Sequence, residues 1–335
     1  VYIGSEAFLS NALESVIIGT ATLESENSPF DVALYNTYQN SPTKSGRYVW
    51  TGSEWFRYTQ DKYFTVVDTE ITGYDINGGL DVIVPSIIDG LSVHAISDSA
   101  FFGKGLTSIV LPNGLLSIGS NALSNNSITT LVIPNSVTSI ANEVARSSSI
   151  VNLTLGTGIV LIGDRAFENN LIENLTINGN VTSIGTYAFY NNKLATLTNL
   201  PSTLVTIGAD AFEKNPLTNV VIPDSVTSMN AYAFYRHKLN TLTIGTGLST
   251  LSTESFWTDD AGVTISSVVI PSNITEIKSG VFKGCPLTQI TIGANVTISS
   301  TTTTMGTNGA SFHTAYSADP QAGTYVYSGG VWTRQ

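Results

Sequence analysis

Apolar residues recur along most of the chain with a period close to 22 residues. Successive segments start 22, 22, 22, 22, 23, 22, 26 and 22 residues apart, at Leu106, Ile128, Ile150, Ile172, Leu194, Leu217, Leu239, Ile265 and Leu287. Each reads roughly L-x-x-L-x-I-P/G-x-x-V-x-x-I-G-x-x-A-F-x-x-N-x. One such unit cannot bury its apolar edge alone, so we expect the units to stack as coils around a continuous core.

The first part of each unit predicts a short strand with one buried face, because its apolar residues alternate. A Pro or Gly then ends the strand. The I-G-x-x-A-F part predicts a turn and a short helical piece that places an aromatic ring inside. Stacking these rings predicts a buried spine of Phe167, Phe189, Phe212, Phe234, Phe256 and Phe282.

Three coils depart from the pattern. In the coil 128–149, Ala145 replaces the Phe and Arg146 follows it, so we expect this coil to be thin. The coil that begins at Leu194 carries one extra residue, because Asn199 stands before Leu200 in the strand. The coil 239–264 is the longest, and its extra residues predict a projecting bulge.

Composition removes several classes of function. Charged residues make up 12% of the 335 residues, and 14 Lys and Arg against 25 Asp and Glu give a net charge of −11. Nucleic acids and anionic membranes attract basic surfaces, so we expect neither as a partner. No apolar run reaches the length of a membrane span, so no membrane insertion is expected.

The sequence offers little material for catalysis or metal binding. It contains three His and one Cys, and it lacks the H-E-x-x-H, G-x-S-x-G and P-loop motifs. We therefore expect no enzyme activity, no catalytic residues, no metal and no cofactor. His237 is expected in a solvated turn, and Cys285 as a small buried residue. The run from Asp75 to Asp81 faintly resembles a calcium loop, but its Asn-Gly pair favours a hairpin turn.

A second, longer period relates the two ends of the chain. GRYVWTGSEWFR (46–57) aligns with GTYVYSGGVWTR (323–334), and LESVIIG (13–19) aligns with LTQITIG (287–293). Residues 1–58 are therefore predicted to be the C-terminal end of a preceding module. Residues 62–335 are predicted to be a complete module with a first coil (62–105), repeats (106–297) and a cap (298–335).

The tail motif of each module predicts a hairpin, because alternating aromatic residues flank a Gly turn. We interpret it as a cap over the open end of the last coil, which solenoids require. An aromatic platform for stacking a sugar ring is the alternative.

The repeat resembles a known family. LTNVVIPDSVTSMNAYAFYRHKL (217–239) and SSVVIPSNITEIKSGVFKGCPL (266–287) are similar to BspA-like leucine-rich repeats, and 71–103 is similar to the usual first coil of that family. The resemblance implies a leucine-rich-repeat solenoid of the β-rich α/β type, with a parallel strand ladder. It also implies an extracellular or cell-surface location and adhesive or protein-binding roles, and it supplies no catalytic residues.

The outward face of the predicted strands is the first candidate binding face. Positions two and four residues after each start share one side of a strand, and they hold neutral Asn and Thr side chains. The candidate residues are Asn152, Thr154, Asn174, Thr176, Thr196, Thr198, Asn219, Thr241 and Thr243. Such a face suits an extracellular protein or glycan. The alternatives are that β-branched residues simply favour strands, or that the Thr ladder binds ice.

The bulge of the coil 239–264 is the second candidate. Trp257, Asp259 and Asp260 are its predicted contact residues, because loops that project from a solenoid often carry binding. The sequence thus favours a non-enzymatic, secreted or surface-attached binding protein. A structural stalk or filament subunit, self-associating through tandem modules, is the alternative.

Overall fold

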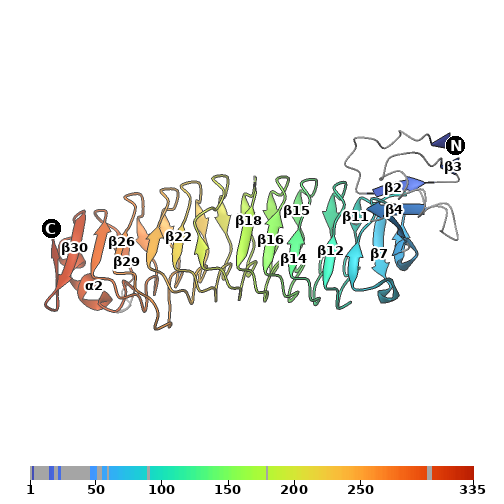
Figure 1. Cartoon of the computed structure of the whole chain (residues 1–335). Coiled ribbons are helices and arrows are strands. Elements are labelled where there is room, and N and C mark those ends of the chain that lie inside the picture. Colours follow the sequence, from blue (N-terminus) through green and yellow to red (C-terminus); the bar gives the residue numbers. More distant parts are fainter. Residues whose placement is uncertain are drawn as a thin grey trace, which may run out of the picture. The chain divides into compact units, whose positions relative to one another are not determined.

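The chain divides into two compact units, Val1–Phe64 and Thr65–Gln335. This computed structural model describes residues 60–88, 91–178, 180–299 and 304–335, together with five strands within 1–58. Unit 2 is a solenoid of about ten stacked turns joined by parallel strands, and its labelled strands β12, β14, β16 and β18 follow one another along the stack (Figure 1). The predicted solenoid is confirmed.

Each coil contributes one strand to a first ladder, which we call the strand ladder. Within it, residues one repeat apart lie in register, as Leu153 beside Leu175 shows. Its members are β8 (Asp81–Ile83), β12 (Ser108–Val110), β14 (Thr130–Val132), β16 (Asn152–Leu155), β18 (Asn174–Ile177), β20 (Thr196–Leu197), β22 (Asn219–Val221), β24 (Thr241–Thr243), β26 (Ser267–Val269) and β28 (Gln289–Ile292).

A second ladder of two-residue strands runs along another side of the coils. It starts on β6 (Phe64–Val67) and β7 (Glu70–Tyr74). It continues through β11 (Ala95–Ile96), β13 (Ser117–Ile118), β15 (Ser139–Ile140), β17 (Leu161–Ile162), β19 (Ser183–Ile184), β21 (Thr206–Ile207), β23 (Ser228–Met229), β25 (Thr250–Leu251), β27 (Glu276–Ile277) and β29 (Thr297–Ile298). A small hairpin, β9 (Ile87–Ile88) with β10 (Leu91–Ser92), lies beside the first coil.

The third side of each coil is a turn, and in the described residues it does not contain the predicted short helical piece. Arg165 and Asn169 both have φ of 56°, a left-handed conformation that cannot continue a helix. Their N–H groups instead donate to the next coil, at Thr186 O (2.8 Å) and Tyr190 O (2.9 Å). Backbone hydrogen bonds therefore join the coils on this side as well.

The phenylalanine spine fills the space between the three sides. All six predicted rings are fully buried, and each stacks on the next at centroid distances of 5.4 to 5.6 Å. The predicted spine is confirmed. Leu123 and Ala145 continue the column in the coils that begin at Leu106 and Ile128, and both are also fully buried.

A buried polar column lies beside the spine, three residues after each ring. Asn170 Oδ1 accepts from the N–H of Ile150 (3.0 Å), and its Nδ2 donates to Phe167 O (3.1 Å) and Ala145 O (2.9 Å). Asn126, Asn192 and Asn215 bind in the same way. The Asn near the end of the repeat therefore satisfies backbone groups that the turn would otherwise leave buried and unpaired.

The last coil is closed by a cap that contains a helix, α2 (Gly309–Ala318), and a hairpin, β30 (Gly323–Ser328) with β31 (Val331–Arg334). The helix lies within the predicted cap (298–335) but was not itself predicted. Phe312 and Tyr316 from α2 pack edge-on against Tyr325, and Phe312 against Trp332. All four rings are buried. This burial agrees with a cap and leaves Tyr325 and Trp332 without the exposed faces that a sugar platform needs.

The strands of unit 1 pair as the strands at the end of unit 2 do. They are β1 (Tyr2–Ile3), β2 (Ser15–Ile18), β3 (Thr22–Leu23), β4 (Gly46–Trp50) and β5 (Trp55–Tyr58), and η1 (Gln60–Tyr63) follows them. β2, β4 and β5 pair antiparallel like β28, β30 and β31. Equivalent residues face each other: Ser15–Val49 and Gln289–Val326, then Tyr48–Arg57 and Tyr325–Arg334.

Both predicted hairpins are therefore present in the structure. The identification of 1–58 as the end of a preceding module, and of 62–335 as a complete one, remains a prediction. The same strand register at both places is what that prediction requires.

Candidate functional site

The candidate binding face lies on the outside of the strand ladder. Of its nine residues, seven are exposed, while Thr154 and Asn219 are half-buried. Strand register places equivalent side chains side by side: Asn152–Asn174 and Thr154–Thr176, then Thr196–Asn219 and Asn219–Thr241. The geometry fits a binding face, and its role in binding remains a prediction.

Side chains on this face bind one another across the coils. Asn174 Nδ2 donates to Asn152 Oδ1 (2.7 Å), and the Thr241 hydroxyl donates to Asn219 Oδ1 (2.7 Å). These bonds restrain the rotamers of the Asn and Thr side chains before any partner arrives. A preorganised surface loses less conformational entropy when it binds.

From the sequence we expect the candidate residues to lie on one sheet face. In the structure they lie on two separate sheets. β14, β16 and β18 form one sheet, and β20, β22 and β24 form the next. Asn152, Thr154, Asn174 and Thr176 therefore lie on the first sheet, and the other five candidates lie on the second. The break falls at the coil with the extra residue.

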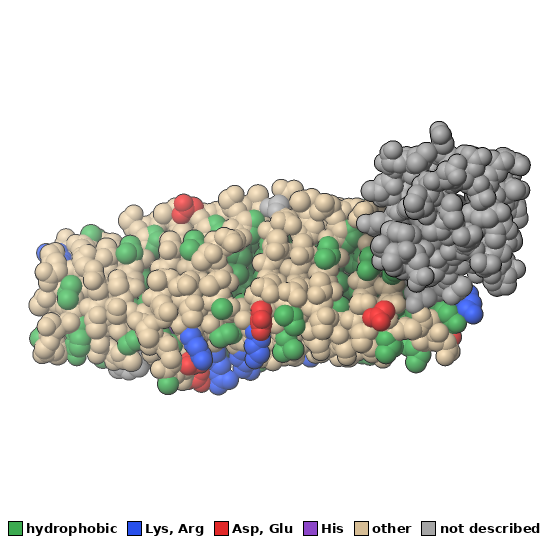
Figure 2. Space-filling model, in the orientation of Figure 1, with side chains coloured by type: hydrophobic (Ala, Val, Ile, Leu, Met, Phe, Trp, Pro, Cys, Tyr) green, Lys and Arg blue, Asp and Glu red, His purple; other side chains and the backbone are tan. Residues whose placement is uncertain are grey.

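Charged side chains gather elsewhere. In Figure 2 few of them interrupt the surface over the coils, and Lys and Arg gather along one edge of the stack. On the turn side of the repeats, most of these cations are paired, as Arg165 with Glu168 (2.9 Å), Arg236 with Asp259 (3.0 Å) and Lys238 with Asp260 (3.7 Å). The charged side chains thus gather on another side of the coils, and the nine residues of the candidate binding face carry no charge.

The predicted contact residues of the bulge belong to this charged side. Asp259 is exposed, while Asp260 and Trp257 are half-buried. The Trp257 ring stacks on the Tyr235 ring, with 4.5 Å between the centroids. The Lys283 ammonium lies over the Trp257 ring, 3.9 Å from its centroid. All three bulge residues are thus engaged within the chain. Their role as a contact site remains a prediction.

His237 is buried, so the expectation of a solvated residue is wrong. It occupies the polar column that Asn holds in other coils. The N–H of Leu239 donates to His237 Nδ1 (3.1 Å), so the proton is on Nε2, which donates to Phe256 O (2.9 Å). Burial lowers the pKa of His237 to about 4. The ring is neutral at pH 7, with both nitrogens used.

Cys285 occupies the same column and is buried, as predicted. Burial raises the pKa of its thiol to about 12, which leaves it protonated and unreactive. His94 is exposed and His313 half-buried. Within the described residues, no group of three or more His, Cys, Asp and Glu side chains could hold a metal ion. No helix in the same residues is long and apolar enough to cross a membrane.

The run from Asp75 to Asp81 does not form the predicted hairpin turn. Its Asn-Gly pair lies in η2 (Ile76–Gly78), between β7 and β8, which belong to different sheets. Asp75 accepts from the N–H of Asn77 (3.0 Å) and from its Nδ2 (2.9 Å). Asp81 accepts from the hydroxyls of Thr107 and Ser108. Both carboxylates therefore bind protein donors from separate elements.

Glu213 is the carboxyl with the most unusual environment. Burial and the neighbouring Asp210 raise its pKa to about 8, against the attraction of Lys214 and Arg236. Asp210 and Glu213 belong to one turn, at the positions that Arg165 and Glu168 hold two coils earlier. The pair therefore repeats a structural position of the turn and lies away from the strand ladder.

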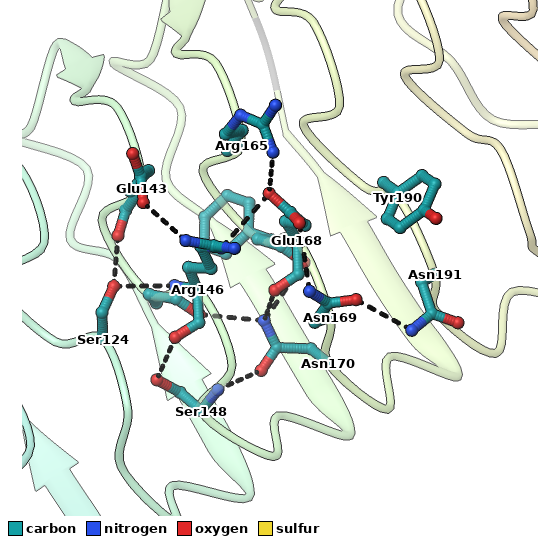
Figure 3. A network of polar contacts seen from close by, with 12 residues as sticks. Ser124, Glu143, Arg146, Ser148, Arg165, Glu168, Asn169, Asn170, Tyr190 and Asn191 are labelled. Carbon is teal, nitrogen blue, oxygen red and sulfur yellow. Dashed lines mark hydrogen bonds and ion pairs between the residues drawn. The ribbon is translucent and has the colours of Figure 1, made fainter.

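A polar network joins the coil 128–149, which has Ala145 in place of the Phe, to the next coil (Figure 3). Glu168, which is buried, lies between two arginines: Arg165 donates to it at 2.9 Å, and Arg146 Nε forms an ion pair with it at 3.3 Å. Arg146 also donates to Glu143 at 3.1 Å. The Arg146 that accompanies the missing Phe thus joins its coil to the next one.

We expect Glu168→Gln to destabilise unit 2 by about 1–3 kcal/mol, because it removes the negative charge that two guanidinium groups share and replaces one carboxylate oxygen with an amide donor. Urea denaturation at pH 7 measures the change. Glu173→Gln is the matched control, because Glu173 is an exposed carboxylate directly before β18. This change should leave stability unchanged. Equal midpoints for the two variants would contradict the role given to this network.

The geometry defines a class of protein: a repeat protein whose coils stack through parallel ladders around a leucine- and phenylalanine-rich core. A family model described as "BspA type Leucine rich repeat region (6 copies)" matches residues 84–196 and 195–307. The chain belongs to this family, which confirms the resemblance found in the sequence. No match was found among curated proteins.

Several solved structures are similar to the chain. A leucine rich cell surface protein from Faecalibacterium prausnitzii A2-165 is 22% identical, with 77% of this chain and 90% of that chain covered and a TM-score of 0.33. A leucine-rich repeat protein from Bacteroides ovatus is 20% identical, covering 70% and 87%, with a TM-score of 0.29. One from Eubacterium ventriosum is 17% identical, covering 69% and 89%, with a TM-score of 0.33. Similarity at this level says nothing about function.

Proposed function

We propose that the chain is a non-enzymatic, secreted or cell-surface protein that binds an extracellular protein or glycan along its strand ladder. The observation that carries the proposal is the largely exposed face of Asn and Thr side chains, which lie in register within the β16–β18 sheet and within the β20–β22–β24 sheet. Membership of the BspA type repeat family supports it.

The physical character of this face determines how it binds. A neutral surface forms few ion pairs, so binding depends little on salt. A regular ladder offers many similar weak contacts instead of one deep anchor. Affinity for a single repeat is therefore modest, and it grows with the number of repeats that the partner spans.

The test uses the full chain and two double variants with equal charge. Thr241→Glu with Thr243→Glu places carboxylates on the ladder face, and Thr227→Glu with Thr275→Glu places them on exposed sites elsewhere on the coils. Binding is measured on an array of extracellular proteins and neutral polysaccharides, with melting curves alongside. We expect the first variant to lose binding and the second to keep it, with stability changed by less than about 0.5 kcal/mol in both.

Two results would count against the proposal. If the ladder variant binds as the wild type does, the site lies elsewhere, at the 257–260 bulge or the cap. If binding disappears at high salt, charged residues carry it, and the neutral face does not.

A structural role is the second candidate, because one observation favours it. The same strand register closes both units of the chain, which is the arrangement of tandem modules in a stalk or filament. In that role the chain self-associates end to end. Sedimentation across a wide concentration range measures this, and a monomer at every concentration speaks against it.

A further inference from the structure

The strand ladder opens at one place inside the candidate face. β18 pairs only with β16, and β20 pairs only with β22, so no ladder hydrogen bond joins β18 to β20 among the described residues. Every residue of both strands is described. The same holds for β12 with β14 and for β24 with β26, whereas the other neighbouring strands of the strand ladder are paired.

At β18 and β20 the break coincides with the extra residue of the 194 coil. Asn199 occupies the strand position that Ile177 holds one coil earlier, and Leu200 takes the buried place one residue late. An added residue of this kind makes a bulge, which disrupts pairing on the bulged strand. β20 is accordingly cut to two residues, whereas β16 and β18 have four.

The opening is a cleft of about 250 Å³, which we call the ladder cleft. Its polar lining comes from Glu173, Asn174, Thr176, Thr196, Thr198 and Asn199. Leu175 and Ile177 lie at its floor and are half-buried, whereas their counterparts Leu153 and Leu155 one coil earlier are fully buried. Four of the nine candidate binding residues therefore line one cavity.

The cleft is a wedge and not a gap between separated coils. On the second ladder, β19 still pairs with β21, Ser183 opposite Thr206. Inside, Phe189 and Phe212 stack at 5.4 Å, as the other spine rings do. The coils therefore keep their normal spacing on two sides, and a whole peptide strand cannot enter between β18 and β20.

The walls of the cleft carry a dense mixture of donors and acceptors. In a parallel ladder, alternate residues direct their backbone groups toward each neighbour, so β18 and β20 each direct one row of N–H and C=O groups into the opening. Thr hydroxyls and Asn amides add further donors and acceptors. Glu173 is the only charged residue in the lining.

We propose that the ladder cleft binds one sugar residue of a neutral, linear glycan that lies along the strand ladder. A pyranose ring fits a wedge of this volume, and its hydroxyls both donate and accept, as the lining requires. Adjacent strands are about 4.8 Å apart, close to the advance of one residue along an extended glycan. Successive sugars can thus meet successive coils. The proposal rests on the binding role of the ladder face and names its ligand class.

Three variants of the full chain test the cleft. Thr198→Phe fills it with a ring. Deletion of Asn199 returns the coil to 22 residues and puts Leu200 in the regular strand position. We expect this to let β20 pair with β18. Val269→Phe is the control, since Val269 is exposed at the same strand position on β26, outside the candidate face.

The probes are linear oligosaccharides of glucose, mannose, xylose and N-acetylglucosamine, and a set of extended peptides, each titrated by calorimetry. We expect at least one oligosaccharide to bind, Thr198→Phe and the deletion to weaken it by roughly tenfold or more, and Val269→Phe to leave it unchanged. The deletion should melt at or above the wild-type temperature. If the deletion variant does not fold, Thr198→Phe alone decides.

The outcomes separate the cleft from the ladder. Oligosaccharide binding that survives both cleft variants but is lost in Thr241→Glu with Thr243→Glu overturns the cleft and leaves the proposed function standing. Binding that survives all of them overturns both. Peptides that bind while every oligosaccharide fails, with loss in Thr198→Phe, overturn the glycan assignment.

Discussion

Replacing Phe212 by Ala should destabilise unit 2 by about 3–5 kcal/mol, the largest effect we expect from a single substitution. Phe212 is fully buried and stacks on Phe189 and Phe234, at 5.4 Å on each side. Its removal leaves a cavity that backbone ladders on three sides of the coil prevent from closing. The lost stacking with two neighbours adds to the lost burial.

Chemical denaturation of the wild type, Phe212→Ala and Phe212→Leu measures this effect. The Leu variant is the matched control, because Leu123 holds the same column position in the 106 coil and is fully buried there. Its cost should be clearly smaller than that of Ala. An Ala variant as stable as the wild type would contradict the contribution to stability that we assign to the phenylalanine spine.

Acidification should destabilise the protein through His237 by about 3 kcal/mol between pH 6.5 and pH 4. An unfolded His has a pKa near 6.5, and burial lowers the folded value to about 4. As the pH falls, the unfolded chain therefore takes up the proton first. The free energy of unfolding decreases until the pH reaches the pKa of His237 in the folded state. Protonation at Nδ1 also breaks the bond from the Leu239 N–H.

The control for this prediction is His237→Asn, which places the usual side chain of the column at the same site and does not titrate. The free energies of unfolding of the two proteins, measured from pH 7.5 to pH 4, should diverge below pH 6.5. Their difference isolates His237 from other titrating groups, including Glu213, whose raised pKa favours the folded state at low pH. Parallel curves would show that His237 is not held neutral.

The sequence predicted the solenoid because one coil is too small to be stable and every coil repeats the same apolar positions. Leu153 and Phe167 are buried, as predicted from the apolar residues that recur at their positions in successive repeats. Columns do not reveal backbone conformation, however. The left-handed φ at Arg165 and Asn169 that replaces the helical piece with a turn depends on hydrogen bonds to the next coil, which no single repeat contains.

The sequence predicted which side chains of the candidate site face outward, but it did not predict the break between β18 and β20. Strand alternation placed Asn174 and Thr176 outward correctly, because that periodicity is local. The single extra residue, Asn199, was visible in the sequence, but its consequence depends on where the neighbouring strand stops pairing. His237 was misplaced for a similar reason: a turn residue is normally solvated, and only the Asn column beside the spine shows that this turn position points inward.

The most direct test of the central claim is hydrogen–deuterium exchange of the full chain with and without its bound target. Binding on the ladder face should protect amides of β16 to β24, with the strongest effect in β18 and β20, and leave the turn side and the cap unchanged. Protection confined to residues 257–260 or to 309–334, with none in those strands, would contradict the account.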